Sequence, residues 1–162
     1  MSIYISATDT AKLVRKALKE NFPGTKFSVR TTKYAGGASL DVNWTGGPTT
    51  PKVDAVVKGF EGSEPDASGD FCDPVIHEKD GQRIQYGARH ILTMRMITQA
   101  TYDTIQTEVL ASMSMASTEV QNWNSYPVPQ IVLQRAEHFR YAQGTVHDFV
   151  RAIADSQDAG PN

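Results

Sequence analysis

The sequence predicts an α+β protein, in which an antiparallel sheet of three or more strands has helices packed on one face and a helical C-terminal extension follows. Three observations support this fold class. Apolar residues recur at helical spacing near the N-terminus, they alternate with polar residues in the next two segments, and Gly or Pro pairs separate these segments. We expect an α+β domain over residues 1–97 and a helical extension over residues 98–162.

The first helix is expected to begin near Ser6, because Asp9 follows three residues later as in a capping box. It should end near Asn21, before Pro23 and Gly24. Its apolar stripe consists of Leu13, Val14, Ala17 and Leu18.

Two alternating runs, residues 26–32 and 40–44, then predict a β-hairpin with one dry face, joined by a turn that contains Gly36 and Gly37. Trp44 alternates in phase with the apolar residues of the second run, so we expect it in the core.

A second helix should begin at Thr49 or Thr50 with Pro51 in its first turn, and its inward residues are Val53, Val56, Val57 and Phe60. Residues 61–82 are acidic and rich in Gly, Pro, Ser and Asp, which predicts a long loop. Residues 83–97 predict one further strand with a bend at Gly87. The extension should hold a helix capped by Thr98 and another capped by Thr145.

The composition indicates a globular protein with one substantial core, since 40% of its 162 residues are hydrophobic. The N-terminus has neither the basic start nor the apolar run of a signal peptide, and no apolar stretch is long enough to cross a membrane. Cys72 is the only cysteine and cannot form an internal disulfide. These features predict a cytoplasmic protein without membrane contact, and they leave the oligomeric state open.

The formal net charge of −2 conceals an uneven distribution. Residues 1–58 hold nine Lys and Arg against four Asp and Glu, whereas residues 59–80 hold seven acids and one Lys. A basic surface attracts polyanions, and an acidic loop can either fold back on that surface or bind a basic partner.

Several short motifs resemble one known domain family. They are Arg15-Lys16 with Leu18-Lys19, Phe22-Pro23-Gly24, Phe27-Ser28-Val29-Arg30, Tyr34 with Gly36-Gly37, Trp44, and Gly47-Pro48. In this order they resemble the large polyvalent-protein-associated domain, class twenty-nine, over residues 8–62 and more loosely over residues 83–95. The chain departs from the family pattern at Thr45-Gly46 and in its extended acidic loop. The resemblance implies a setting in phages or conjugative plasmids, some of whose proteins are delivered with DNA and counter host defences.

One candidate site is basic. Four cations lie on one face of the first helix, and the hairpin adds two more cations, an aromatic ring and a glycine turn that could offer backbone N–H groups to a phosphate. The full set is Lys12, Arg15, Lys16, Lys19, Arg30, Lys33, Tyr34, Gly36 and Gly37. The alternatives are an ordinary solvated helix face and an ordinary hairpin turn. The corresponding function is a non-enzymatic accessory protein that binds nucleic acid or a nucleoprotein.

The alternative site is the acidic loop, which would bind a basic partner as an anti-restriction or anti-CRISPR inhibitor does. Its residues are Glu61, Glu64, Asp66, Asp70 and Asp73. Cys72 and His77 in the same loop, with Asp70 and Asp73 beside them, could ligate zinc or support nucleophilic catalysis, but the sequence has no second Cys and no ligand pair such as His-x-x-x-His. We therefore expect no enzyme activity, no metal and no cofactor.

Overall fold

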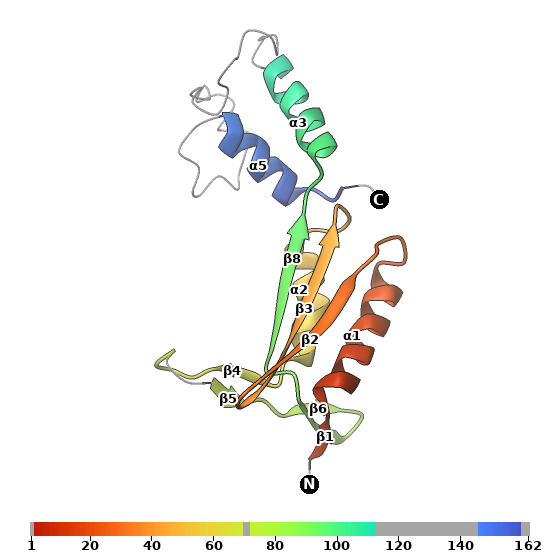
Figure 1. Ribbon diagram of the computed structural model, residues 1–162, viewed down its shortest axis with the longest axis vertical. Helices are drawn as coiled ribbons and strands as arrows, with labels where there is room; N and C mark the ends of the chain where they lie inside the picture. Colours follow the sequence, from red (N-terminus) through yellow and green to blue (C-terminus); the bar gives the residue numbers. More distant parts are fainter. Residues whose placement is uncertain (1, 70–71, 113–145, 160–162) are drawn as a thin grey trace. The chain divides into compact units, whose positions relative to one another are not determined.

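The computed structural model describes residues 2–69, 72–112 and 146–159, and the chain divides into two compact units with their boundary between Met96 and Ile97. The first unit contains β1 (Ile3–Ile5), α1 (Ala7–Asn21), β2 (Ser28–Tyr34), β3 (Gly37–Thr45), α2 (Thr50–Val57), the 3₁₀ helix η1 (Lys58–Phe60), β4 (Ser63–Pro65), β5 (Cys72–Pro74), β6 (His77–Lys79), β7 (Gln82–Tyr86) and β8 (His90–Met96) (Figure 1). The second unit contains α3 (Gln99–Ser112) and α5 (Val146–Ser156). The predicted α+β class and helical C-terminal extension are confirmed.

The central sheet has the strand order β2-β3-β8. Strands β2 and β3 form the predicted antiparallel hairpin, in which Tyr34 pairs with Gly37 beside the turn. Strand β8, however, runs parallel to β3, so the sheet is mixed and the purely antiparallel arrangement that we expected is wrong for this third strand. Helix α2 lies between β3 and β8 in the sequence. It carries the chain back to the end of the sheet at which β3 begins, as a connection between parallel strands requires.

A second small sheet explains two further differences from the sequence predictions. It has the strand order β1-β7-β6, and β4 and β5 pair with each other in a separate two-stranded sheet. Residues 61–82 therefore contain the short strands β4, β5 and β6, where we expected only a loop. The single strand expected over residues 83–97 is two strands in different sheets, separated by residues 87–89. Those three residues bond to other segments: Gly87 N–H donates to Ile5 O, Ala88 O accepts from Gly62 N–H, and Arg89 N–H donates to Ala38 O.

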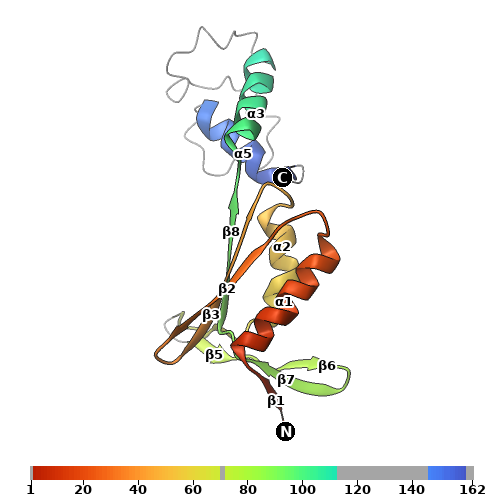
Figure 2. The same ribbon diagram turned by 45° about the vertical axis from the view of Figure 1, so that its right-hand side comes forward.

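Helices α1 and α2 cover the same face of the central sheet, and Figure 2 shows this sheet nearly edge-on with both helices on one side. Between them lies the core, formed by Ala11, Val14, Leu18, Val29, Leu40, Val42, Trp44, Val53, Val57, Ala88 and Ile91. Trp44 is 2% exposed, as predicted, and its indole N–H donates to Pro48 O at 2.9 Å. Its ring lies 5.6 Å from that of Phe27, between ring centroids, and Phe27 in turn contacts Phe22.

The second unit places α3 against α5, with Ile105 and Val109 of α3 and Val150 and Ala154 of α5 buried. The hydroxyl of Thr98 accepts the N–H of Thr101 at 3.2 Å, which confirms the predicted cap of the first of these helices. The predicted cap at Thr145 lies outside the described residues. No described helix has both the length and the apolar character needed to span a bilayer.

We predict that Trp44→Ala lowers the free energy of unfolding by about 3–5 kcal/mol, because it removes a large buried aromatic side chain. Trp44→Phe should cost less, since a ring remains, although the Pro48 carbonyl loses its donor. Denaturant titration of both variants measures the two effects. A Trp44→Ala protein as stable as the wild type would contradict the buried position of this ring.

A second stability prediction concerns Gly62. A Cβ atom at this position would lie 1.9 Å from the Tyr86 carbonyl oxygen, whereas a Cβ at Gly59 would meet nothing within 4 Å. We expect Gly62→Ala to lower the free energy of unfolding by at least about 2 kcal/mol through overpacking against backbone. The matched control, Gly59→Ala, should change it far less. Equal melting temperatures for the two variants would show that the segment can shift freely.

Candidate binding surface

Three of the four cations predicted on α1 contact other groups of the protein, although the Lys12 and Lys16 side chains remain 69% and 74% exposed. Lys12 Nζ lies 2.8 Å from Asp9 Oδ1, and Lys16 Nζ lies 3.9 Å from Glu20 Oε1. The guanidinium of Arg15 donates to the Val29 carbonyl of β2 at 2.6 Å. Among the described residues, only Lys19 of the four makes no such contact.

Asp9 pairs with Lys12 within the first turns of α1. The hydrogen bond from Lys12, the hydrogen bond from Ser6 and the charge of Lys12 together hold the pKa of the Asp9 carboxyl below its ordinary value of 3.8. The Ser6 hydroxyl also accepts the Asp9 N–H at 3.2 Å, so the predicted cap of α1 is confirmed. The Asp9 carboxylate therefore offsets part of the positive charge that the sequence assigns to this helix.

The hairpin residues of the basic set do not all join the α1 face. Arg30 points to the face of the sheet opposite the helices, because it alternates with buried Val29, and alternation turns Lys33 to the other side of β2. Tyr34 is 44% exposed and pairs with Gly37 next to the turn. The structure thus divides these cations between two faces.

Gly37 instead lies against Arg89, a cation that sequence reasoning missed, whereas nothing lies within 4 Å of a Cβ built on Gly36. Gly36 has a φ of 101° at the tip of the hairpin, and a Cβ on Gly37 would lie 2.8 Å from Arg89 Cδ. A hollow of about 390 Å³ lies beside them, lined also by Cys72. The bond from Arg89 N–H to Ala38 O and the parallel pairing of β8 with β3 that follows bring this distant position to the hairpin, and no sequence motif signals it.

The acidic residues of the alternative site have unequal roles. Glu61 Oε1 accepts the N–H of Ile91 at 2.6 Å and the ammonium of Lys58 at 2.8 Å, and the same ammonium donates to Ile91 O. Asp66 closes a local turn by accepting from Ser68 and Gly69. Glu64 and Asp73 are exposed on β4 and β5, and Asp70 lies outside the described residues.

The Cys72 and His77 side chains are not brought together. The Cys72 sulfur lies 3.9 Å from His90 Nε2, while His77 bonds to the Glu61 carbonyl at 2.6 Å and stacks against Tyr86. Within the described ranges, no group of three His, Cys, Asp or Glu residues gathers as metal ligands would.

The surface that stands out is the side of the central sheet opposite α1 and α2, which we call the open face (Figure 2). On β8, its residues Leu92, Met94 and Met96 are 57%, 63% and 53% exposed. We call these three residues the apolar stripe. Most of its other positions are polar: Ser28, Arg30 and Thr32 of β2, Ser39, Asp41, Asn43 and Thr45 of β3, and His90 of β8. Tyr34, 44% exposed, lies on this face at the hairpin end. In the sequence the apolar stripe looks like core, because no local pattern shows that α1 and α2 both pack against the opposite face of the sheet.

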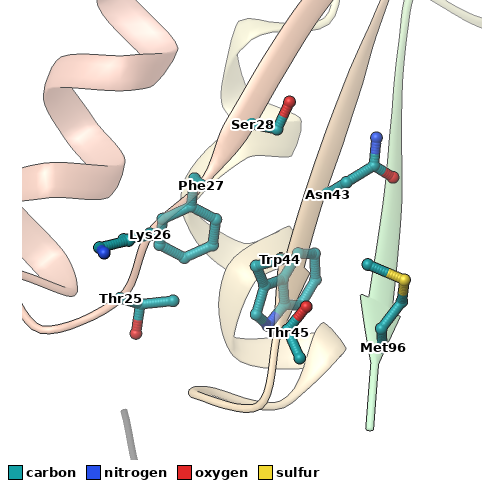
Figure 3. Close-up of a pocket in the computed structure, with 8 residues that line it drawn as sticks. All are labelled: Thr25, Lys26, Phe27, Ser28, Asn43, Trp44, Thr45 and Met96. Atoms are coloured by element: carbon teal, nitrogen blue, oxygen red, sulfur yellow. The ribbon is translucent and has the colours of Figure 1, made fainter. Parts of the chain in front are cut away.

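A hollow of about 500 Å³ lies at one corner of the sheet, and we call it the corner pocket (Figure 3). Strand β2 stops pairing at Ser28 opposite Asn43, whereas β3 and β8 remain paired as far as Thr45 and Met96. The lining residues are Thr25, Lys26, Phe27, Ser28, Asn43, Trp44, Thr45 and Met96. The corner pocket therefore adjoins the apolar stripe through Met96.

Comparison with known proteins gives one match. Residues 5–98 match the family described as large polyvalent protein associated domain 29. This span includes the central sheet and both helices that cover it. No curated protein and no solved structure gives a significant match.

We predict that Glu61→Ala lowers the free energy of unfolding by about 1–3 kcal/mol, because the Ile91 N–H loses its charged acceptor. Glu64→Ala removes an exposed carboxylate from the same segment and should leave stability nearly unchanged. Thermal or chemical unfolding distinguishes the two. If both variants are as stable as the wild type, Glu61 does not hold β8 and remains available to a partner.

Proposed function

The chain belongs to the family of large polyvalent protein associated domain 29, and from this premise we propose that it is a non-enzymatic accessory module that binds another protein. The proposed contact is the open face of the central sheet. The proposed setting is a mobile genetic element, either a phage or a conjugative plasmid. An inhibitor that binds a host restriction or CRISPR protein is one form of this function.

The observation that carries the proposal is the exposed apolar stripe. Alternation along β8 turns Ile91 and Thr93 toward the helices and Leu92, Met94 and Met96 away from them. Single exposed apolar residues are ordinary on a surface, but contiguous ones mark interaction sites. Methionine side chains are flexible and polarisable, which suits them to pack against a partner. Burial of this stripe would supply a favourable term that the isolated unit lacks.

Nucleic-acid binding through α1 has less support. Three of its four predicted cations already contact Asp9, Glu20 or the Val29 carbonyl. Proteins that bind single strands also present aromatic rings for base stacking. Here the rings of Phe27 and Trp44 pack against each other, and Tyr34 lies at the hairpin end of the open face. We therefore favour a protein partner.

Two acid–base groups of the first unit support the non-enzymatic part of the proposal. The His77 imidazole bonds to a backbone carbonyl, and the Glu61 carboxylate holds a backbone N–H of β8. These contacts give both side chains structural roles.

The test begins with a photo-crosslinking amino acid at Met94 in the full chain, expressed in a host that carries the element. Ala55, exposed on α2 on the helix-covered side, is the matched control position. We expect a specific protein adduct from position 94 and not from position 55. The identified protein would then be purified for affinity measurements.

With that protein, Met94→Glu should weaken binding at least about tenfold, because a charge would be buried in the contact. The double variant Lys16→Glu with Lys19→Glu should bind like the wild type, since it leaves the open face intact. The opposite ranking would contradict the proposal. Binding of the wild type to DNA or RNA that falls steeply with salt and is abolished by the double variant would replace it with the nucleic-acid function.

A further inference from the structure

The corner pocket indicates what the partner presents, if the proposed protein-binding function holds. We propose that it receives an apolar anchor side chain from a short partner segment that carries an acidic residue next to the anchor. The rest of the segment would continue along the apolar stripe of β8.

The corner pocket is formed by the early end of strand β2. Phe27 leaves the line of β2 and packs between Phe22 and Trp44, with ring centroids 6.0 and 5.6 Å apart. Strand β2 therefore ends at Ser28, whereas β3 and β8 remain paired for two more residues. A hollow of about 500 Å³ remains at the step, within the range of roughly 300–1,000 Å³ typical of ligand sites.

Its walls are suited to an apolar group with a polar surround. Partly buried Phe27 supplies ring surface with buried Trp44 behind it, and Met96 enters from β8 on the other side (Figure 3). At the rim, the side chains of Ser28, Asn43 and Thr45 make no hydrogen bond within the described part of the chain, so they can bond to a partner's backbone. An apolar centre with a polar rim is the usual anatomy of a protein-binding hot spot.

Charge complementarity indicates which residue the partner carries next to its apolar anchor. Lys26 lines the corner pocket, is exposed, and has no carboxylate partner among the described residues. Arg30 lies on the same strand and also makes no ion pair among the described residues, while Asp41 opposite it accepts a hydrogen bond from Thr32. This corner of the open face is therefore positively charged. An acidic side chain beside the anchor would meet it, whereas a basic one would be repelled.

The first experiment uses the full chain with ¹³C-methyl-labelled methionine, in which the Met96 signal is assigned from Met96→Leu. The probes are 12-residue synthetic peptides with a central Leu flanked by Asp, the same peptide with Ala at the centre, and the same peptide with Lys flanks. We expect the Asp-flanked Leu peptide to shift the Met96 signal in a saturable manner. Replacement of Leu by Ala, or of Asp by Lys, should each weaken binding at least about tenfold.

Lys26→Glu should reverse the preference between the Asp and Lys flanks, which tests the charge contact directly. Equal binding of Asp-flanked and Lys-flanked peptides would overturn the inference, as would the absence of binding by any peptide. An eight-residue oligothymidine that shifts the Met96 signal more tightly than the peptides would assign the corner pocket to nucleic acid instead.

A second experiment separates this inference from the proposed function. Ser28→Trp fills the corner pocket from an exposed strand position that tolerates aromatic residues, and Ala55→Trp places the same ring on the exposed side of α2, away from the open face. With the natural partner, Ser28→Trp should weaken binding at least about tenfold and Ala55→Trp should not, with both variants first shown to melt like the wild type. Loss of binding in Met94→Glu with full binding in Ser28→Trp would overturn the pocket inference alone. Full binding in both would overturn the function as well.

Discussion

Three consecutive residues between β7 and β8 hold the first unit together. Gly87 bonds to β1, Ala88 to the segment before β4, and Arg89 to the start of β3, so one short connector fixes both sheets and the β4–β5 hairpin. Ala88 is fully buried, and Gly62 approaches the Tyr86 carbonyl where no side chain fits. The small sheet, the start of β8 and the position of Arg89 all depend on these backbone bonds.

The parts of the fold that could be predicted are those encoded by local patterns. Ser6 with Asp9 marks the start of α1, and alternation around Val29 and Val42 marks the hairpin and its dry face. Strand β1 and strands β4–β6 are three residues long, too short for a period to be recognised. The parallel pairing of β8 depends on the path through α2, and Gly87 looks like a bend because its tertiary partners are not visible in the sequence.

The candidate site shows a similar division. The sequence identifies charged side chains, but it does not show which groups they contact in the folded protein. Arg15 and Glu61 serve backbone groups of β2 and β8, and Lys12 is held by Asp9. Conversely, Met94 is exposed because α1 and α2 both cover the other face of the central sheet, and the corner pocket follows from the point at which β2 leaves β3. Neither property is local in sequence, so both require the three-dimensional arrangement.

The contacts of Lys58 and Glu61 with Ile91 also affect how another strand could pair with β8. Their side chains satisfy both the N–H and the C=O of Ile91, much as an adjacent strand would. An edge strand with such groups free is a template for pairing with another sheet. Lys58 and Glu61 therefore block strand addition at Ile91, and they leave the exposed side chains on the face of β8 as the route for association.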